Sequence, residues 1–247
     1  MEKSNKVALL VAAGDAVGAA VARKFATNGY KVCIARRDAE KSQALIDELT
    51  EQGCDIRAFS VDARKESQVQ ELFARVEAEV GPIEVSLYNG GANIKKPLLE
   101  TTEKIFHRSW ELACFAGFLV GREAARYMVP RGRGTMLFTG ATSSLRGGAG
   151  YAAFSAAKMG LRGAVQAMAR ELGPLNIHVM HLIIDAGVDS AEIHRRLAVE
   201  LGIDASKLPP DSMTKTASIA DTYWYVHQQP RDAWTHEMDI RPAIEKW

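Results

Sequence analysis

Residues 7–20 read VALLVAAGDAVGAA, an apolar run of strand length that leads through a glycine turn into an alanine-rich helix. A strand buried on both faces is apolar throughout, and glycines in the turn allow the helix to start close to the strand. The free amides at the start of such a helix suit a pyrophosphate. The stretch therefore predicts the first strand and helix of a dinucleotide-binding sheet, the alternative being a turn that serves helix packing alone. The residues expected at the dinucleotide are Gly14, Ala16, Val17, Gly18 and Ala19.

The same alternation of strand-like and helical segments continues through most of the chain. Further apolar runs of strand length lie at residues 31–35, 55–61, 83–88, 135–139 and 177–184. Helical patterns lie at residues 16–28, 39–52, 64–80, 102–129 and 151–172. This order predicts an α/β fold, a Rossmann-type doubly wound parallel sheet with helices on both faces, as a single domain over residues 1–247.

The C-terminal part departs from this regular alternation. Residues 189–212 are more polar than the segments before them and include Pro209-Pro210. They follow the sixth strand, at the edge where a parallel sheet binds its ligand, so we expect a mobile flap beside the site. A helix around residues 218–229 and a terminal strand around residues 234–240 complete the expected fold.

The composition limits the class of partner. The formal net charge is +1 with acids and bases interspersed, which favours a small-molecule ligand over nucleic acid or a membrane surface. The cysteines Cys33, Cys54 and Cys114 lack metal-type spacing, and so sparse a set is typical of reduced thiols in the cytoplasm. His178 and His181 lie three apart on a predicted strand and so on opposite faces, and we expect no metal site.

Basic residues at the end of the second strand indicate the cofactor. Arg36 and Arg37 stand where an acid would bind the ribose hydroxyls of NAD. Two guanidinium groups suit a 2′-phosphate, so the predicted cofactor is NADP(H), the alternative being a solvated basic helix start. Asp15 is unexpected, because a carboxylate in the turn would repel phosphates unless it points outward or caps an amide.

Four sequence marks then follow one another at characteristic spacing. They are a G-x-x-x-G-x-G-like turn at Gly14, Gly18 and Ala20, then Asp62 and Ala63, then Asn89-Gly90-Gly91, and finally Phe154-Ser155-Ala156-Ala157-Lys158. Together they resemble the short-chain dehydrogenase/reductase family over nearly the whole chain. The resemblance implies cofactor contacts at Asp62, Ala63, Asn89, Gly90, Gly91 and Lys158. It also implies a homodimer or homotetramer built on the helices at 102–129 and 151–172.

The catalytic residues of that family carry over only in part. The resemblance implies that Lys158 lowers the pKa of a tyrosine acid and holds the nicotinamide ribose. The tyrosine position is Phe154, however, which cannot donate a proton at any pH. The serine position falls on Ala141 and the asparagine position on Ala113. We therefore expect a site that has kept its cofactor half and lost its proton-donating half.

Three other side chains are candidates for the chemistry. Thr142 adjoins the serine position, with a turn cap as the alternative role. Tyr151 shares a helix face with Phe154 but lies about one turn, roughly 5 Å, further from Lys158, and its alternative role is a pocket wall. Asp185 ends the sixth strand in the ligand crevice, where the family has Pro-Gly, and its alternative role is a turn-forming acid held by local amides.

These observations leave two main functions open. The first is an NADP(H)-dependent oxidoreductase that works without the tyrosine acid and reduces a C=N bond, as imine or iminium, or another pre-activated double bond. An iminium is protonated before hydride arrives, and Asp185 would favour its charge. The alternative is a catalytically silent NADP(H)-binding pseudoenzyme that acts as a regulatory or partner subunit. A third hypothesis, an interaction protein that no longer binds nucleotide, has only Asp15 and Ala20 in its support.

Overall fold

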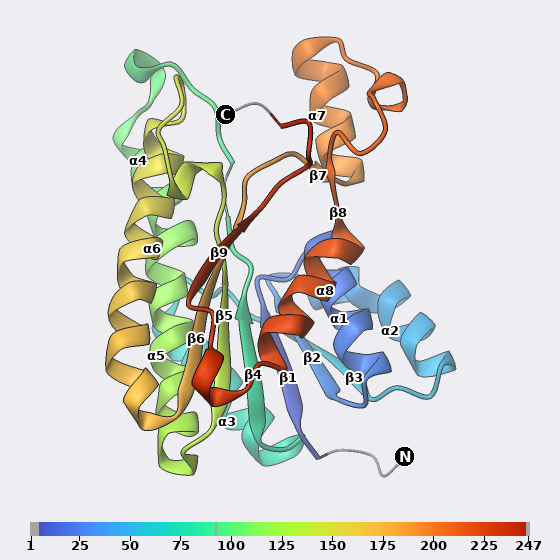
Figure 1. Ribbon diagram of the computed structural model, residues 1–247, viewed down its shortest axis with the longest axis vertical. Coiled ribbons are helices and arrows are strands. Elements are labelled where there is room, and N and C mark those ends of the chain that lie inside the picture. Colours follow the sequence, from blue (N-terminus) through green and yellow to red (C-terminus); the bar gives the residue numbers. More distant parts are fainter. Residues whose placement is uncertain (1–4, 92, 246–247) are drawn as a thin grey trace.

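Seven strands form one parallel sheet in the structure, a computed structural model that describes residues 5–91 and 93–245 (Figure 1). Their spatial order is β3-β2-β1-β4-β5-β6-β9, so the chain winds outward in both directions from the centre of the sheet. The doubly wound sheet expected from the sequence is therefore confirmed. The strands are β1 Val7–Val11, β2 Lys31–Arg36, β3 Ile56–Ser60, β4 Ile83–Tyr88, β5 Gly134–Thr139, β6 Ile177–Ile184 and β9 Glu237–Ile240, with a separate pair β7 Val188–Asp189 and β8 Thr214–Lys215.

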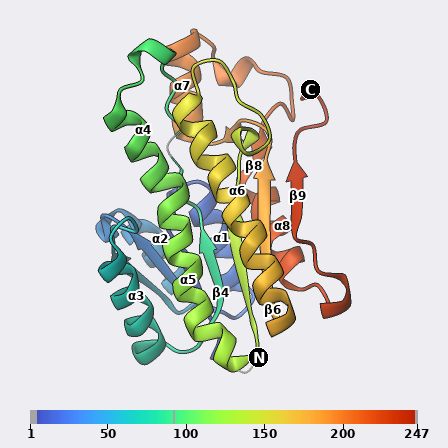
Figure 2. The same cartoon turned by 90° about the vertical axis from the view of Figure 1, so that its left-hand side faces the viewer.

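Helices cover both faces of the sheet, as Figure 1 and Figure 2 show. Alternation along β1 divides its side chains between two cores. Val7, Leu9 and Val11 pack with α3, α5 and α6, whereas Ala8 and Leu10 pack with α1 and α8. The helices are α1 Val17–Thr27, α2 Gln43–Glu51, α3 Glu66–Glu79, α4 Glu103–Trp110, α5 Ala116–Met128, α6 Ala152–Leu172, α7 Ala191–Leu201 and α8 Thr216–His227.

The position of β1 fixes where a ligand binds. Val11, the last residue of β1, pairs with Ala35 of β2 on one side and with Tyr88 of β4 on the other. The strand order reverses here, and the crevice beyond the carboxyl ends is the ligand site of such sheets. Gly18 lets α1 start against this crevice, because a Cβ there would lie 2.6 Å from the Ala13 Cβ and 2.7 Å from its Cα.

The helix predicted over residues 102–129 is interrupted. A π-helical turn at Glu111–Phe115 separates α4 from α5. The Tyr88 hydroxyl donates a hydrogen bond to the Leu112 carbonyl within this turn. A π turn widens the helix and changes its internal hydrogen bonding, so a carbonyl becomes accessible to an outside donor. The interruption thus depends on a partner in β4, which helical periodicity does not reveal.

The segment expected to be a flap, residues 189–212, is largely helical. Ser190 caps the start of α7, and Gly202, with φ of 65°, ends it. Arg196 Nη1 donates to the Asn93 carbonyl at 3.0 Å, which links α7 to the loop after β4. The segment therefore contacts the loop after β4, and its role as a mobile flap beside the site stays a prediction.

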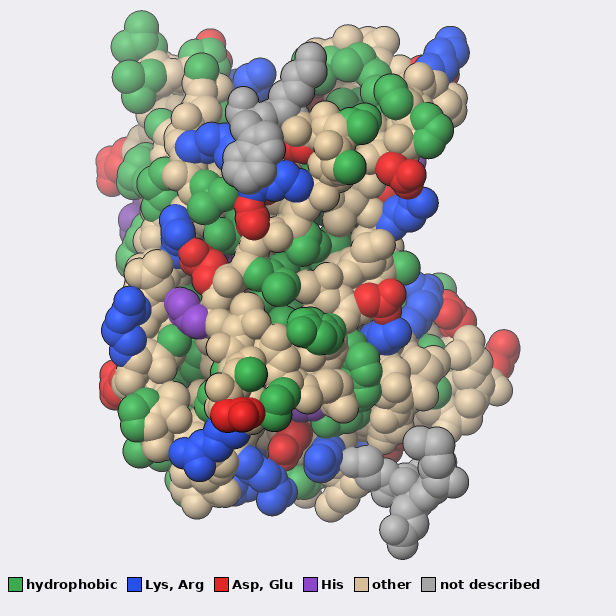
Figure 3. Space-filling model, in the orientation of Figure 1, with side chains coloured by type: hydrophobic (Ala, Val, Ile, Leu, Met, Phe, Trp, Pro, Cys, Tyr) green, Lys and Arg blue, Asp and Glu red, His purple; other side chains and the backbone are tan. Residues whose placement is uncertain are grey.

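The surface carries charges of both signs. Basic and acidic side chains are intermixed on the face seen in Figure 3, which is hollowed beneath the lobe that contains α7. Within residues 5–91 and 93–245, no helix combines the length and the hydropathy that crossing a membrane requires.

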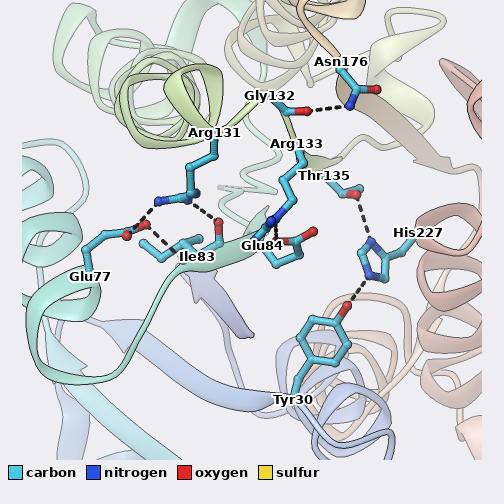
Figure 4. A network of polar contacts seen from close by, with 10 residues as sticks. All are labelled: Tyr30, Glu77, Ile83, Glu84, Arg131, Gly132, Arg133, Thr135, Asn176 and His227. Carbon is cyan, nitrogen blue, oxygen red and sulfur yellow. Dashed lines mark hydrogen bonds and ion pairs between the residues drawn. The ribbon is translucent and has the colours of Figure 1, made fainter. Parts of the chain in front are cut away.

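Polar side chains connect the central strands at the end of the sheet opposite the ligand crevice (Figure 4). Arg133 Nε pairs with a Glu84 carboxylate oxygen at 3.0 Å. His227 of α8 lies between two hydroxyls, with Tyr30 Oη 2.6 Å from its Nε2 and Thr135 Oγ1 2.9 Å from its Nδ1. Burial lowers the pKa of His227 to about 4, so this histidine is neutral in the folded protein at physiological pH.

We predict that the protein loses stability as the pH falls below about 6.5, the pKa of an unfolded histidine. Burial lowers the pKa of both His181 and His227 to about 4. Between these values the unfolded chain binds protons that the folded chain does not. The contribution of these two histidines to the free energy of unfolding is therefore fully present above pH 6.5 and decreases toward pH 4. Urea unfolding at pH 7.5 and 5.0 should show a loss on the order of 2 kcal/mol for each histidine.

His227→Gln isolates one of these contributions, because glutamine keeps a donor and an acceptor but does not titrate. The pH-dependent loss should be smaller in this variant. His107→Gln, at a side chain that is 64% exposed, is the matched control and should leave the loss unchanged. An undiminished loss in His227→Gln would contradict the assignment.

Candidate functional site

Two adjoining cavities open at the carboxyl end of the sheet. The smaller, of about 240 Å³, lies across the turn after β1 and the ends of β2, β3 and β4. The larger, of about 610 Å³, starts from the same loop after β4 and extends along α6 to α7. The smaller cavity brings together the predicted cofactor residues Gly14, Arg36, Arg37, Asp62, Ala63, Asn89, Gly90 and Gly91. The larger brings together Val17, Thr142, Tyr151, Phe154 and Lys158.

The turn before α1 fits an anionic ligand. Gly14 borders open space, since a Cβ built there would meet no atom of the described residues within 4 Å. Ala16 precedes the helix and provides no side-chain cap, and the Ala19 N–H already donates to the Gly14 carbonyl at 3.0 Å, so the Val17 and Gly18 N–H groups are the ones left for a ligand. Gly18 and Ala19 are buried behind the turn. Ala16, Gly18 and Ala19 therefore shape the backbone of the site, and their side chains do not line the cavity.

The charged residues at the smaller cavity are partly engaged with one another. Arg36 forms an ion pair with Asp15, whose side chain is 77% exposed. The Asp15 carboxylate thus points outward, and its pairing explains how the turn tolerates an acid. Arg37 lines the cavity. Asp62 accepts hydrogen bonds from Arg64 Nε at 2.8 Å and Nη2 at 2.6 Å, and these bonds lower the pKa of the Asp62 carboxyl.

The ammonium group of Lys158 is buried at the larger cavity. Its Nζ donates to the Gly90 carbonyl at 2.9 Å and to the Thr139 carbonyl at 2.7 Å, at the ends of β4 and β5. Burial lowers the pKa of Lys158 to about 8. The Phe154 ring lies one helical turn earlier, with its centroid 6.0 Å from Nζ. Backbone carbonyls therefore hold this lysine, and one of its three donors remains for a ligand.

The positions of the lost catalytic groups lie around Lys158. Phe154 and Ala141 line the larger cavity with it. Ala113 is fully buried in the π-helical turn. Ser143, two residues after Ala141 and close to the serine position in the sequence, also lines the cavity. The hydroxyl-bearing neighbours of the serine position are thus present, but no proton donor stands at residue 154.

Tyr88 is a residue of the site that the sequence did not single out. Its side chain is fully buried, and its hydroxyl donates to the Leu112 carbonyl. A Cβ at Gly90 would collide with this hydroxyl, so the loop after β4 requires glycine there. Because the Gly90 carbonyl receives Lys158, Tyr88 positions the lysine indirectly. An aromatic residue at the end of an apolar run gives no sign of such a contact.

The two candidates for replacing the lost hydroxyls differ in their surroundings. Tyr151 immediately precedes α6 and lines the larger cavity, with Lys95 Nζ 5.9 Å from its ring centroid. Thr142 lines the same cavity but hydrogen-bonds the Asp185 carboxylate. Within the described chain, the hydrogen bonds of the Lys158 ammonium go to backbone carbonyls and to neither of these hydroxyls.

Asp185 has a different environment from the one predicted. Its carboxylate is 1% exposed, accepts hydrogen bonds from Arg146 Nη1 and Nη2 at 3.1 Å each, and lies 3.3 Å from Arg241 Nη1. Burial opposes its ionisation, but Thr142, Arg146 and the charge of Arg241 lower its pKa below the usual value. The expectation that Asp185 offers a free carboxylate to a cationic substrate is therefore wrong, because two guanidinium groups already neutralise it. The alternative prediction, a turn-forming Asp185 held by local amides, is also wrong, because arginine side chains hold its carboxylate.

The two strand histidines contact different partners. His178 stacks on Trp234 at a centroid distance of 4.8 Å, and His181 Nδ1 lies 3.1 Å from a Glu237 carboxylate oxygen. Across the part of the chain that the structure describes, no three His, Cys, Asp or Glu side chains are arranged to hold a metal ion.

The fold and the two cavities define a class of α/β protein that binds its ligand at the topological switch of a parallel sheet. A family model for short chain dehydrogenases matches residues 6–196. The chain belongs to the short-chain dehydrogenase family, whose members similar to this chain include oxidoreductases.

Individual similar proteins agree with this assignment. The uncharacterized oxidoreductase YuxG of Bacillus subtilis (strain 168) is 29% identical over 90% of this chain, although the match spans only 33% of YuxG. A solved short-chain dehydrogenase from Rhodopseudomonas palustris is 44% identical, with a TM-score of 0.83 over 97% of this chain and 99% of that one. A tyrosine-to-phenylalanine variant of ElxO with NADPH bound shares the fold, at 20% identity and a TM-score of 0.84 over 95% of this chain and 96% of that one.

Two substitutions test the basic residues at the smaller cavity. Arg37→Ala should weaken NADPH binding by about 10- to 100-fold, the range for a hydrogen-bonded charge, while NADH, which lacks the 2′-phosphate, should lose little affinity. Asp15→Asn should tighten NADPH binding by about threefold or more, because it frees Arg36 from its ion pair and leaves the guanidinium for a phosphate.

Calorimetric titration with both dinucleotides provides the measurement. Asp47→Asn, at an exposed acid of α2, removes the same charge elsewhere and is the control. Equal losses of NADPH and NADH affinity in Arg37→Ala would show that this arginine does not recognise the 2′-phosphate.

Proposed function

We propose that this protein is an NADP(H)-dependent oxidoreductase that works without a tyrosine acid and reduces a C=N bond or another pre-activated double bond. The observation that carries the proposal is the composition of the cavity around Lys158. Phe154 and Ala141 line it where the family resemblance implies an acid and an orienting hydroxyl. A site that keeps its cofactor residues but lacks its proton donor suits a substrate that needs no proton from the protein.

The residues of the smaller cavity fit NADP(H). Gly14 and the first amides of α1 would hold the pyrophosphate, and Arg37 would hold the 2′-phosphate. Lys158 has one donor left for the nicotinamide ribose. The NADPH-bound ElxO variant, which shares the fold, supports this choice of cofactor. When bound, NADPH supplies a hydride.

The cost of the lost acid indicates the substrate class. A general acid typically contributes about 10²–10⁴-fold to a rate, and a ketone depends on it because hydride addition leaves an alkoxide. An iminium carbon accepts hydride while the C=N electron pair moves to a nitrogen that already carries its proton. Holding such a substrate in place supplies catalysis by itself. The cavity therefore suits C=N reduction better than ketone reduction, and this argument stands without any contribution from Asp185.

A catalytically silent NADP(H)-binding subunit is the second candidate, and one observation favours it. The carbonyls of Gly90 and Thr139 satisfy Lys158 without any tyrosine, so the lysine can hold cofactor in a protein that catalyses nothing. In such a protein, Lys158→Ala would weaken NADPH binding, and no substrate would consume the cofactor.

We further propose a cytoplasmic homodimer or homotetramer assembled through α4, α5 and α6. These helices lie side by side on one face of the molecule in Figure 2. These helices expose large apolar side chains, with Trp110 and Phe118 each 38% exposed and Met159 41% exposed. A monomer mass in sedimentation velocity would overturn the assembly.

The cysteines support the cytoplasmic location. Cys33, Cys54 and Cys114 are free thiols, which suits a reducing compartment.

Oxidation of NADPH, followed at the nicotinamide absorbance, tests the function against matched cyclic imines and ketones. We expect turnover of imines, with ketones slower by about 100-fold or more because they need the missing acid. Cofactor binding is measured alongside. Tight NADPH binding without turnover of either class would favour the silent subunit.

Phe154→Tyr should return a proton donor to its place beside Lys158. We expect ketone turnover to rise by about tenfold or more and imine turnover to change little, so the imine rate is the internal control. Ketone turnover that does not respond would show that residue 154 is not where a proton donor acts.

A further inference from the structure

An arginine places a positive charge at the wall of the larger cavity. Arg146 follows a short helical turn at Thr142–Ser144, and its side chain is 45% exposed and lines the cavity. Its Nη1 and Nη2 each donate to Asp185 at 3.1 Å. Asp185 itself is 1% exposed and does not line the cavity. The carboxylate thus acts as an anchor behind the wall, and the guanidinium is the group that a ligand meets.

The anchor is itself held from a second side. Arg241, 12% exposed, lies 3.3 Å from the Asp185 carboxylate and also pairs with Asp239. Asp185 therefore contacts two arginines, and one of them also contacts a second acid. Because both terminal nitrogens of Arg146 bind one carboxylate, the plane of its guanidinium is fixed before any ligand arrives.

Arg146 keeps donors for a ligand. A guanidinium has five N–H donors, and the two bonds to Asp185 engage only its terminal nitrogens. Among the described residues, none accepts a hydrogen bond from the Arg146 Nε. The Nε–H and the outer N–H of the terminal nitrogen next to it remain together on one edge of the guanidinium, and this edge matches a carboxylate with two parallel hydrogen bonds.

The other charges at the cavity narrow the ligand further. Lys158 and Glu245 are the remaining charged side chains in the described lining. Lys158 directs two of its donors to backbone carbonyls. Arg146 and Glu245 then present one positive and one negative group to the same space. A ligand with a negative and a positive end matches this pair better than a neutral ketone does.

We propose that Arg146 binds a carboxylate of the substrate, so that the substrate is an imine that also bears a carboxylate group. This inference rests on the proposed function, because it names the substrate class of that reductase. In its iminium form such a substrate is a zwitterion. Hydride from NADPH adds to the iminium carbon, the C=N electron pair becomes the lone pair of the product amine, and NADP⁺ is formed. No proton donor is consumed, which agrees with a phenylalanine at residue 154.

Two imines that differ only in the carboxylate test the inference, 1-pyrroline-2-carboxylate and 1-pyrroline. With the full chain and NADPH, the KM of the carboxylate-bearing imine should be lower by about 10- to 100-fold, the range for a charged hydrogen-bonded pair. Arg146→Gln should raise that KM by a similar factor and leave both kinetic constants of 1-pyrroline unchanged. Calorimetric binding of pyrrolidine-2-carboxylate and pyrrolidine to the NADP⁺ complex gives the same comparison without turnover.

Two further variants protect the test against a folding defect. Arg146→Gln combined with Asp185→Asn removes both charges of the pair, which avoids a buried carboxylate with one partner lost, and should show the same loss. Arg170→Gln removes an exposed arginine near the far end of α6 and should change neither substrate.

The outcomes separate this inference from the reductase proposal. Reduction of both imines with equal KM, or a carboxylate preference that survives in both Arg146 variants, would overturn the carboxylate site and leave the reductase standing. Binding of pyrrolidine-2-carboxylate that depends on Arg146, without turnover of either imine, would support the anion site and overturn the reductase. If neither imine reacts and neither amine binds, both are overturned.

Discussion

The buried ammonium of Lys158 is the constraint around which the site is arranged. A charged amine removed from water is costly unless polar partners satisfy it, and here the carbonyls of Gly90 and Thr139 do so. These carbonyls end two neighbouring strands, β4 and β5. Helix α6 must therefore start where its lysine reaches both of them. That position also brings Phe154, one turn earlier, to the cavity wall.

The need to satisfy the Lys158 ammonium also constrains the backbone of the loop after β4. Gly90 can present its carbonyl only because it lacks a side chain that would collide with the Tyr88 hydroxyl. That hydroxyl in turn binds the Leu112 carbonyl, within the π-helical turn that separates α4 from α5. Ala113 lies in this turn, at the position where the family resemblance implies an asparagine. The turn that receives the buried tyrosine therefore carries a fully buried alanine in place of that polar side chain.

Much of the fold could be predicted from the sequence, because a strand buried on both faces leaves a continuous apolar run. The runs Ile83–Tyr88 and Ile177–Ile184 coincide with β4 and β6. Helix α7 was missed although Ile193, Leu197 and Leu201 recur at helical spacing, because the polar composition of residues 189–212 and Pro209-Pro210 were given more weight. The π-helical turn was missed because its cause lies in another element.

The residues of the site likewise fall into those that the sequence could place and those that it could not. Gly14 could be placed from its position shortly after the first strand, whereas Lys158 was placed by the resemblance of residues 154–158 to the family's catalytic helix. Asp185 directly follows β6, as its place in the sequence indicates, but it lies behind the cavity wall. Its charge was misjudged because its partners are distant in sequence: Arg146 lies in a loop before α6, and Arg241 follows β9. No local pattern encodes which way a side chain turns. The consequence is chemical, since the charge at the cavity wall is positive where a negative one was expected. One substrate then suits both the absence of an acid at residue 154 and the presence of the Arg146 guanidinium. Its carboxylate binds the arginine, and its protonated nitrogen needs no acid.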